Sequence, residues 1–188
     1  MSIQITHLGS GSRGNATLLS SNGTNVLVDC GFSTRQTEKR LGILGVEPTS
    51  IDAVFVTHHH KDHSGSALRS SKSWGSSLHC NLETAIRMGW SPTDDCKTFG
   101  NLDMVEVSSS LSMLAIPVPH DDADNVAIIA SDRGGDRAAI VTDLGEATHD
   151  LISHLRGWGR NSLEAKSDHS NLFNGPYPDS LKGRISGR

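Results

Sequence analysis

The stretch VFVTHHHKDHSGSA, residues 54–67, places four histidines and one aspartate within six positions, directly after an apolar run. Histidines this close together repel one another when protonated and pack poorly when neutral, so a role in core packing is not expected. Loops held at the edge of a rigid sheet are where binding residues collect. The stretch therefore predicts a functional site where a buried strand enters a loop.

The spacing within this stretch indicates two pairs of metal ligands. His58 and His60 are two positions apart, so an extended backbone points both side chains the same way. Asp62 and His63 follow where a helix is expected to begin, and they can face a neighbouring point. Imidazole suits Zn²⁺, and carboxylate widens the choice to Mn²⁺ or Fe²⁺. The set lacks cysteine and has too many ligands for a closed structural zinc site, so it favours a catalytic pair of ions.

Length and composition are those of an ordinary globular protein. The 188 residues suffice for one domain, residues 1–188, with a sizeable core. The net charge of −4 excludes the general basic character of a protein that coats nucleic acid. No apolar run approaches the roughly 20 residues of a membrane span, and no secretory signal is evident, so we expect no membrane partner and a cytoplasmic location. Three cysteines without C-x-x-C spacing argue against a disulfide framework.

Short apolar strands that end in polar residues recur along the chain. Strands are expected near residues 25–29, 53–57, 112–118 and 138–142, with helices between some of them. The first ends at Asp29, the third runs towards His120, and the last ends just before Asp143. This order of elements predicts sheets covered by helices, with metal-competent groups at the strand ends.

These motifs resemble, in order and over nearly the whole chain, those of the metallo-β-lactamase-fold hydrolases. The matching segments are VLVDCG, THHHKDH, VPHDDADN and VTDLG. The opening LGSGSRGNATLL and the late LEAKSDHSNLFNGPYPDSLKGRI resemble the YycJ/WalJ branch of nuclease-like proteins in particular. The resemblance implies an α/β (α+β) fold, an αββα sandwich of the metallo-β-lactamase type.

The resemblance also implies a ligand set for two divalent metal ions, Zn or Mn. Six residues would bind them: His58, His60 and His120 the first ion, Asp62 and His63 the second, and Asp143 both. Asp62 would in addition be catalytic, because it can orient the hydroxide formed from a bridging water.

Four further residues are implied to lie around these ligands. Asp29 would orient the ligands without binding metal itself, although an aspartate two positions before Gly31 also suits a plain turn. The GSGSRGN loop could contact substrate or could be a simple tight connection. Its candidate substrate-binding residues are Ser10, Ser12 and Asn15.

Two departures from the YycJ/WalJ pattern concern the C-terminal part. Lys166 and Ser167 stand where that branch has Asn-His, and His169 follows two positions later. The branch also continues beyond the R-I-x-G segment into a Gly-His-Leu-Ser stretch that supplies a further histidine. We therefore expect a fold lacking the last strand and helix elements, and a second metal site that is short of one ligand unless His169, His149, water or a partner chain supplies it. Reduced stability or a homodimer would follow.

The first functional hypothesis is a phosphodiesterase or exonuclease acting on DNA. Two cations about 3.5–4 Å apart would lower the pKa of a bridging water and neutralise charge on the phosphoryl oxygens. The same hydroxide can attack a carbonyl, so a β-lactamase or a small-ester or thioester hydrolase is the second hypothesis. A basic groove from Lys166 to Arg184 would favour a polynucleotide substrate. A hydrophobic pocket would instead favour a small ester as the substrate. A non-catalytic metal-binding interaction module is the third hypothesis.

Overall fold

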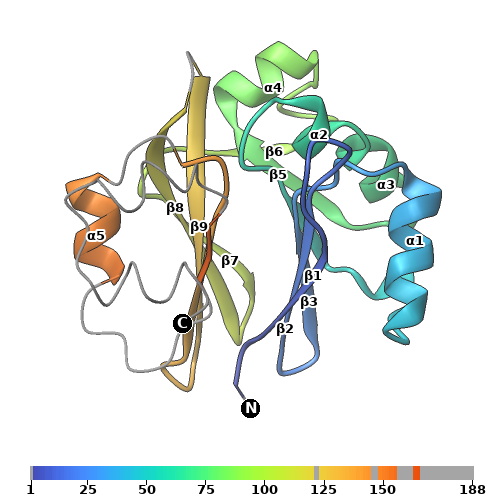
Figure 1. Ribbon diagram of the computed structural model, residues 1–188, viewed down its shortest axis with the longest axis horizontal. Helices are drawn as coiled ribbons and strands as arrows, with labels where there is room; N and C mark the ends of the chain where they lie inside the picture. The colour runs from blue at the N-terminus through green and yellow to red at the C-terminus, as the bar shows by residue number, and fades with distance from the viewer. Residues whose placement is uncertain (1, 121–122, 145–147, 156–162, 166–188) are drawn as a thin grey trace.

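Two β-sheets face each other at the centre of the molecule, and helices cover their outer faces (Figure 1). The computed structural model describes residues 2–120, 123–144, 148–155 and 163–165. The first sheet contains β1 (Gln4–Gly9), β2 (Ala16–Ser21), β3 (Thr24–Val28), β4 (Ala53–Phe55), β5 (Ser77–Asn81) and β6 (Lys97–Phe99), in that order. The second contains β7 (Met104–Ser108), β8 (Leu111–His120), β9 (Ala123–Asp132), β10 (Arg137–Val141) and β11 (Leu163–Ala165).

The helices divide between the two outer faces. On the side of the first sheet lie α1 (Thr34–Ile43), η1 (Pro48–Ser50), α2 (Lys61–Ser64), α3 (Ala67–Trp74) and α4 (Leu82–Met88). On the side of the second sheet lies α5 (His149–Leu155). The layers therefore follow the order helix, sheet, sheet, helix, which confirms the αββα architecture predicted from the sequence. Among the described helices, none is both long enough and apolar enough to cross a bilayer.

Strand direction explains why polar groups collect at one edge of the first sheet. β3, β4, β5 and β6 are parallel neighbours, whereas β1, β2 and β3 form an antiparallel meander. Val28 pairs with Phe55, and Phe55 pairs with His79, so the carboxyl ends of these strands lie side by side. Binding residues gather at the carboxyl ends of parallel strands because the loops there converge. Residues just after β3 and β4 are thus brought together.

The second sheet brings its own strand ends to the same edge. β8 and β9 form a long antiparallel hairpin, and β10 is antiparallel to β9, so β8 and β10 run in the same direction. His120 at the end of β8 pairs with Ala123 at the start of β9. The residues that follow β10 consequently lie at the same edge of this sheet as His120.

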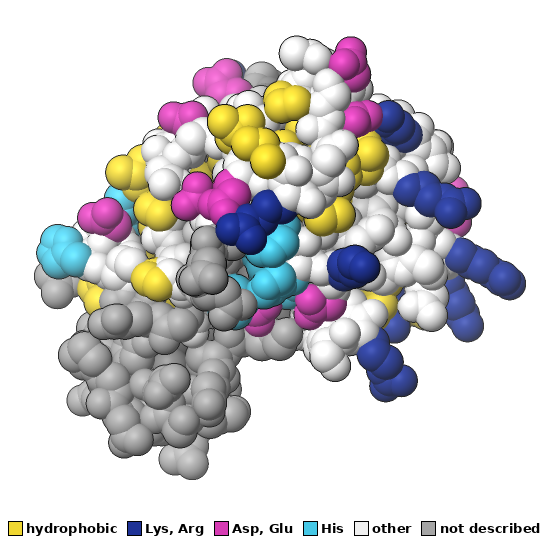
Figure 2. Space-filling view, turned by 90° about the horizontal axis from the view of Figure 1, so that it is seen from above, with side chains coloured by type: hydrophobic (Ala, Val, Ile, Leu, Met, Phe, Trp, Pro, Cys, Tyr) yellow, Lys and Arg dark blue, Asp and Glu magenta, His cyan; other side chains and the backbone are white. Residues whose placement is uncertain are grey.

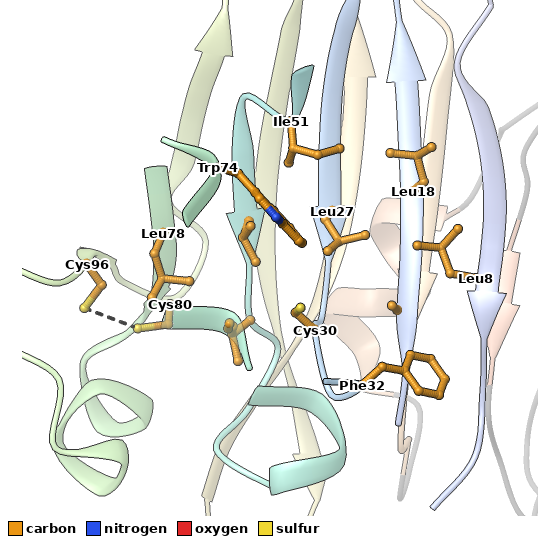
Figure 3. Close-up of a cluster of buried hydrophobic side chains, with 14 of the residues drawn as sticks. Leu8, Leu18, Leu27, Cys30, Phe32, Ile51, Trp74, Leu78, Cys80 and Cys96 are labelled. Carbon is orange, nitrogen blue, oxygen red and sulfur yellow. Dashed lines mark hydrogen bonds between the residues drawn. The ribbon is translucent and has the colours of Figure 1, made fainter. Parts of the chain in front are cut away.

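Three apolar layers hold the sandwich together. The first lies between the first sheet and its helices, where Figure 3 shows Leu18 and Leu27 on strands and Trp74 on α3 within one cluster. The second lies between the two sheets and includes Phe55 and Ile128. The third packs Leu151 of α5 against the second sheet. Each layer removes apolar surface from water, which stabilises the fold by about 25 cal/mol per Å² of buried area.

The three cysteines are free and buried, and the sulfurs of Cys80 and Cys96 lie 3.7 Å apart.

The sequence pattern predicts one helix over residues 64–71, whereas the structure has two, α2 up to Ser64 and α3 from Ala67 onward. Gly65 caps the end of α2, and the backbone N–H of Ser66 donates to the carbonyl of Cys30 instead of continuing the helix. The chain then starts again as α3. The sequence pattern does not predict the three-residue strands β6 and β11, because neither contains an apolar run like that of β4.

Stability should depend on the buried imidazole of His79. Its ring stacks on Phe55 with 4.6 Å between ring centres, and burial, with a further contribution from Lys97, lowers its pKa to about 4. The pKa of histidine in an unfolded chain is about 6.5. Because the folded pKa is the lower one, the unfolded state takes up the proton first, and stability is lost as the pH falls from about 6.5 to 4.

We expect the variant His79→Gln to lose less stability on acidification than the wild type. Between pH 7 and pH 5 the fall in the free energy of unfolding should be about 2 kcal/mol smaller in the variant. Urea unfolding at both pH values measures this difference. Equal falls in the two proteins would show that His79 makes no contribution to the acid sensitivity.

Candidate metal centre

The predicted polar residues lie together at the edge where the strands of both sheets end. Figure 2 shows histidine side chains gathered in a hollow of this face, with acidic side chains beside them. The loop after β4 carries His58 and His60, α2 carries Asp62 and His63, and β8 ends at His120. Each of the two sheets therefore contributes to a shared cluster of imidazoles and carboxylates.

Three imidazoles form the first group that could hold a cation. The ligand atoms of His58, His60 and His120 all lie within 4.8 Å of one another. His58 Nε2 is 3.1 Å from His60 Nδ1. Two nitrogens each about 2.0–2.1 Å from a tetrahedral Zn²⁺ would be about 3.3 Å apart, close to the observed spacing. The donor set therefore fits a divalent ion.

A second group shares His58 with the first. It consists of His58, His63 and Asp143, whose ligand atoms again lie within 4.8 Å of one another. Asp143 Oδ2 is 2.7 Å from His63 Nε2 and 3.6 Å from His58 Nε2. Asp62 Oδ2 is 3.6 Å from His63 Nε2. The structure thus brings all six sequence-predicted ligands to one place, with His58 common to the two groups and Asp143 in the second.

The buried carboxylate of Asp29 holds this cluster in place through hydrogen bonds. Its side chain is 1% exposed. One oxygen accepts the backbone N–H of Thr57 at 2.9 Å, and the other accepts Nδ1–H of His63 at 2.6 Å. A histidine that donates Nδ1–H to a carboxylate directs its Nε2 outward as the ligand atom. Asp29 therefore fixes the orientation of His63 and the start of the histidine loop at once.

Two aspartates adopt a backbone conformation that few residues accept. Asp29 has φ of 62° and Asp143 has φ of 47°, both in the left-handed region. Aspartate tolerates this region better than most residues other than glycine, and such conformations cluster at functional sites. The turn at Asp143 is held by Asn125, whose Nδ2 donates to the carbonyls of Thr142 and Asp143 at 3.3 Å.

Burial and charge give the histidines different protonation states. Burial lowers the pKa of His58 to about 3, with a contribution from the positive charge of His63. Burial also acts to lower the pKa of His63, but the carboxylates of Asp29 and Asp143 outweigh it and raise that pKa to about 10. His58 is therefore neutral and offers a lone pair. His63 holds a proton among carboxylates, where a divalent ion would replace it.

Sequence reasoning did not identify the threonines that connect the cluster. Thr57 Oγ1 lies 3.0 Å from both carboxylate oxygens of Asp29 and 3.0 Å from His58 Nδ1. Thr142 Oγ1 donates to Thr57 Oγ1 at 3.3 Å and so joins the two sheets. A signal was present in the sequence, because a Val-Thr pair stands directly before the histidine cluster and again before Asp143.

The three candidate substrate-contacting residues lie in different surroundings. Asn15 is 4% exposed, and its Nδ2 donates to Asp62 Oδ2 at 3.1 Å and lies 2.9 Å from His63 Nε2. Asn15 thus holds the metal-ligand loop from within. Ser10 and Ser12 instead line an open hollow between residues 9–14 and α1.

A comparison with known protein families matches residues 9–157 to the metallo-beta-lactamase superfamily. The matched range contains every residue of the two candidate metal-binding groups. This chain belongs to the metallo-beta-lactamase superfamily. Membership in a superfamily of metallo-hydrolases supports an enzyme, and the clustered imidazoles and carboxylates indicate divalent metal binding.

Within the metallo-beta-lactamase superfamily, the chain is similar to two bacterial nucleases. Exodeoxyribonuclease YycJ of Bacillus anthracis is 28% identical over 197 residues, covering 98% of this chain and 71% of the relative. Exodeoxyribonuclease WalJ of Streptococcus pneumoniae is 24% identical over 190 residues, covering 95% of this chain and 68% of the relative. These findings confirm the resemblance to the YycJ/WalJ branch predicted from the sequence.

Solved structures of the metallo-beta-lactamase superfamily share the fold. A metallo-β-lactamase HARLDQ-motif mutant of Cronobacter sakazakii superimposes with a TM-score of 0.69 at 14% identity, covering 98% of this chain and 81% of the other. At this identity the likeness concerns the fold alone.

Some sequence-based expectations lie outside the described residues. They concern Lys166, Ser167 and His169, and the basic groove proposed from Lys166 to Arg184. His149, the other candidate for a missing ligand, is described and is an exposed residue of α5. Neither candidate metal-binding group among the described residues includes it.

Because Gly31 has no side chain, the backbone after β3 can lie directly against α2. A side chain at this position should push α2 away from that backbone. A Cβ at Gly31 would lie 1.7 Å from the backbone oxygen of Asp62. We expect Gly31→Ala to lower the free energy of unfolding by several kcal/mol, on the order of the larger point-mutation effects, and to reduce zinc content.

The control for Gly31→Ala is Gly42→Ala. Gly42 is an exposed residue of α1, and its Cβ would meet no atom within 4 Å. This change should be neutral or stabilise by about 0.5–1 kcal/mol, because alanine favours a helix. Thermal unfolding and metal analysis of both variants measure the difference. Similar values for the two variants would contradict the close contact of Gly31 with Asp62.

Asp29 should govern metal affinity without being a ligand itself. In Asp29→Asn the amide group cannot accept hydrogen bonds from both Thr57 and His63, so the imidazole loses its fixed orientation. We expect a fall in Zn²⁺ affinity of about 10–100-fold, measured by competition with a chelator. The control is Asp52→Asn, because Asp52 also accepts a backbone N–H, that of Asn25 at 2.8 Å, but is exposed near the start of β4. Unchanged affinity in Asp29→Asn would contradict the positioning role.

Proposed function

We propose that this chain is a metal-dependent phosphodiesterase, an exonuclease that acts on DNA with two divalent ions, Zn or Mn. The observation that carries the proposal is the pair of adjacent metal-binding groups that share His58. Phosphoryl transfer by paired cations requires two such sites next to each other. The choice of DNA is supported by the similarity to YycJ and WalJ, which extends over nearly the whole chain.

The proposed ligands comprise every residue of the two groups and add Asp62, whose Oδ2 lies 3.6 Å from His63 Nε2. His58, His60 and His120 would hold one ion, Asp62 and His63 the other, and Asp143 would contact both. Divalent ions held there lower the pKa of water and neutralise charge that develops on phosphoryl oxygens. The remaining steps depend on residues of the chain.

Asp62 is the proposed catalytic residue. Its side chain is partly exposed, and Asn15 fixes one of its oxygens by a 3.1 Å hydrogen bond. A carboxylate held in this way can orient the attacking water and accept its proton. His63 keeps its proton at Nδ1, towards Asp29, so that its Nε2 faces the reaction site.

The lining beside the cluster favours a polyanion over a β-lactam or small ester. The hollow between residues 9–14 and α1 is lined mainly by glycine, serine, arginine and glutamine. Pockets for small apolar substrates are lined predominantly by hydrophobic and aromatic side chains. Phe32 is the one aromatic residue in this lining, and a guanidinium covers its ring.

The proposal is tested with three substrates and one pair of histidine variants. We expect the zinc- or manganese-loaded protein to hydrolyse bis-p-nitrophenyl phosphate and to shorten labelled DNA, without turnover of nitrocefin. His60→Ala should reduce kcat/KM for the phosphodiesters by at least about 100-fold, because a proposed ligand is lost. His154→Ala, on α5, should have no effect.

Metal analysis accompanies these assays, and we expect about two ions per chain in the wild type. Nitrocefin turnover without phosphodiesterase activity would replace the proposal with the β-lactamase hypothesis. Absence of both metal and turnover would favour a non-catalytic interaction module.

A further inference from the structure

A polar hollow of about 840 Å³ opens between α1 and the glycine-rich loop, residues 9–14, which is hydrogen-bonded through Asn15 to Asp62 of the candidate metal centre. Its polar side chains are those of Ser10, Ser12, Arg13, Gln36 and Arg40. No carboxylate belongs to its lining. The lining thus carries two positive guanidinium groups and no negative side chain, although the net charge of the whole chain is −4. The hollow therefore has the charge and the donors to receive an anion.

Arg40 is already fixed in place within this hollow. Its Nη1 donates to the backbone carbonyl of Leu8 at 2.7 Å, and its guanidinium carbon lies 4.2 Å from the ring centre of Phe32. The first contact uses one of the five N–H donors of a guanidinium. A side chain that is ordered before binding loses little conformational entropy when a ligand arrives.

The glycines of the loop make this arrangement possible. A Cβ at Gly14 would lie 2.6 Å from a Phe32 ring carbon, and one at Gly9 would lie 2.7 Å from another. The loop backbone thus rests directly on the ring that supports Arg40. Gly14 also has φ of 146°, a conformation that L side chains rarely adopt.

The same loop is tied to the candidate metal centre. The backbone N–H of Gly11 donates to Asn15 Oδ1 at 2.9 Å, and Asn15 Nδ2 donates to Asp62 Oδ2 at 3.1 Å. One side chain therefore joins the wall of the hollow to a proposed metal ligand. A group bound in the hollow would keep a fixed position relative to the reacting bond.

We propose that this hollow is a subsite for a phosphate group of the nucleic acid strand, next to the phosphodiester that is cleaved; this inference rests on the proposed function. Arg13 and Arg40 bind the phosphate oxygens, because the planar guanidinium fork matches them, and the hydroxyls of Ser10 and Ser12 donate to the same group. Figure 2 shows further Lys and Arg side chains to the right of the histidines. Figure 1 places α1 and α3 on that part of the molecule.

The test measures strand binding separately from bond cleavage. The metal-loaded protein is titrated into a fluorescent single-stranded phosphorothioate oligonucleotide, which resists hydrolysis, carrying either a 5′-phosphate or a 5′-hydroxyl. We expect Arg13→Gln and Arg40→Gln each to weaken binding about 10-fold, the effect of losing one charge-assisted hydrogen-bonded contact. Each should also reduce the slope of log K against log salt by about 0.7, as expected for one lost phosphate contact on a single strand.

The control for both variants is Arg133→Gln, which removes the same charge from an exposed position. Arg133 follows β9, a ten-residue strand that starts beside His120 and therefore ends far from the site. This variant should bind like the wild type. Arg13 is exposed, so Arg13→Gln tests the subsite even if Arg40→Gln lowers the melting temperature.

Hydrolysis of bis-p-nitrophenyl phosphate separates this inference from the proposed function. The small substrate carries one phosphate, so both arginine variants should hydrolyse it within about twofold of the wild-type rate if that phosphate occupies the metal centre. Weakened binding of the 5′-phosphorylated strand alone would assign the subsite to a terminal phosphate, and weakened binding of both strands to an internal phosphodiester. The subsite would be wrong if both arginine variants kept the wild-type strand affinity and the wild-type slope of log K against log salt. It would also be wrong if the wild type bound no strand. If the wild type hydrolyses no phosphodiester but the arginine variants still bind the strand more weakly, the proposed hydrolase function would be wrong and the subsite would stand.

Discussion

The buried carboxylate of Asp29 is the constraint on which the candidate site depends. It accepts hydrogen bonds from the backbone of Thr57, at the start of the histidine stretch, and from His63, near the end of that stretch. A buried charge deprived of such partners costs about 3–5 kcal/mol, so the surrounding loops stay where they satisfy it. The left-handed backbone at Asp29 is maintained for the same reason. One carboxylate thereby holds both ends of the histidine stretch, residues 57–63.

The candidate site lies across the contact between two sheets, and its geometry depends on their packing. Thr57 follows a strand of the first sheet and Thr142 a strand of the second, and their hydroxyls are hydrogen-bonded. The backbone N–H of Val126 donates to the carbonyl of Thr57, which adds a second link between the sheets. Close-packed interiors transmit small displacements instead of absorbing them. The apolar layer between the sheets therefore fixes the distance from His58 to Asp143.

Charge is distributed so that a polyanion can approach an acidic centre. Asp62 and Asp143 alone would repel a phosphate, and divalent ions would reverse that local sign. The arginines beside the glycine-rich loop add positive charge on the side of α1, outside the proposed ligand set. The two features are mechanically joined through Asn15, which contacts both the loop and Asp62. The proposed cleavage and the proposed strand binding thus share one rigid frame.

Strand patterns and ligand spacing are local properties, so they were sufficient to predict which histidines and aspartates follow the ends of the strands. The sequence predicted the αββα fold, which the structure confirms, and it singled out the residues around His58. It did not separate α2 from α3, because that break depends on a hydrogen bond from Ser66 to the distant Cys30. The hydrogen bond between Thr142 and Thr57 and the packing of Arg40 on Phe32 became visible in the folded chain alone. Such contacts join residues far apart in the chain, and local periodicity carries no information about them.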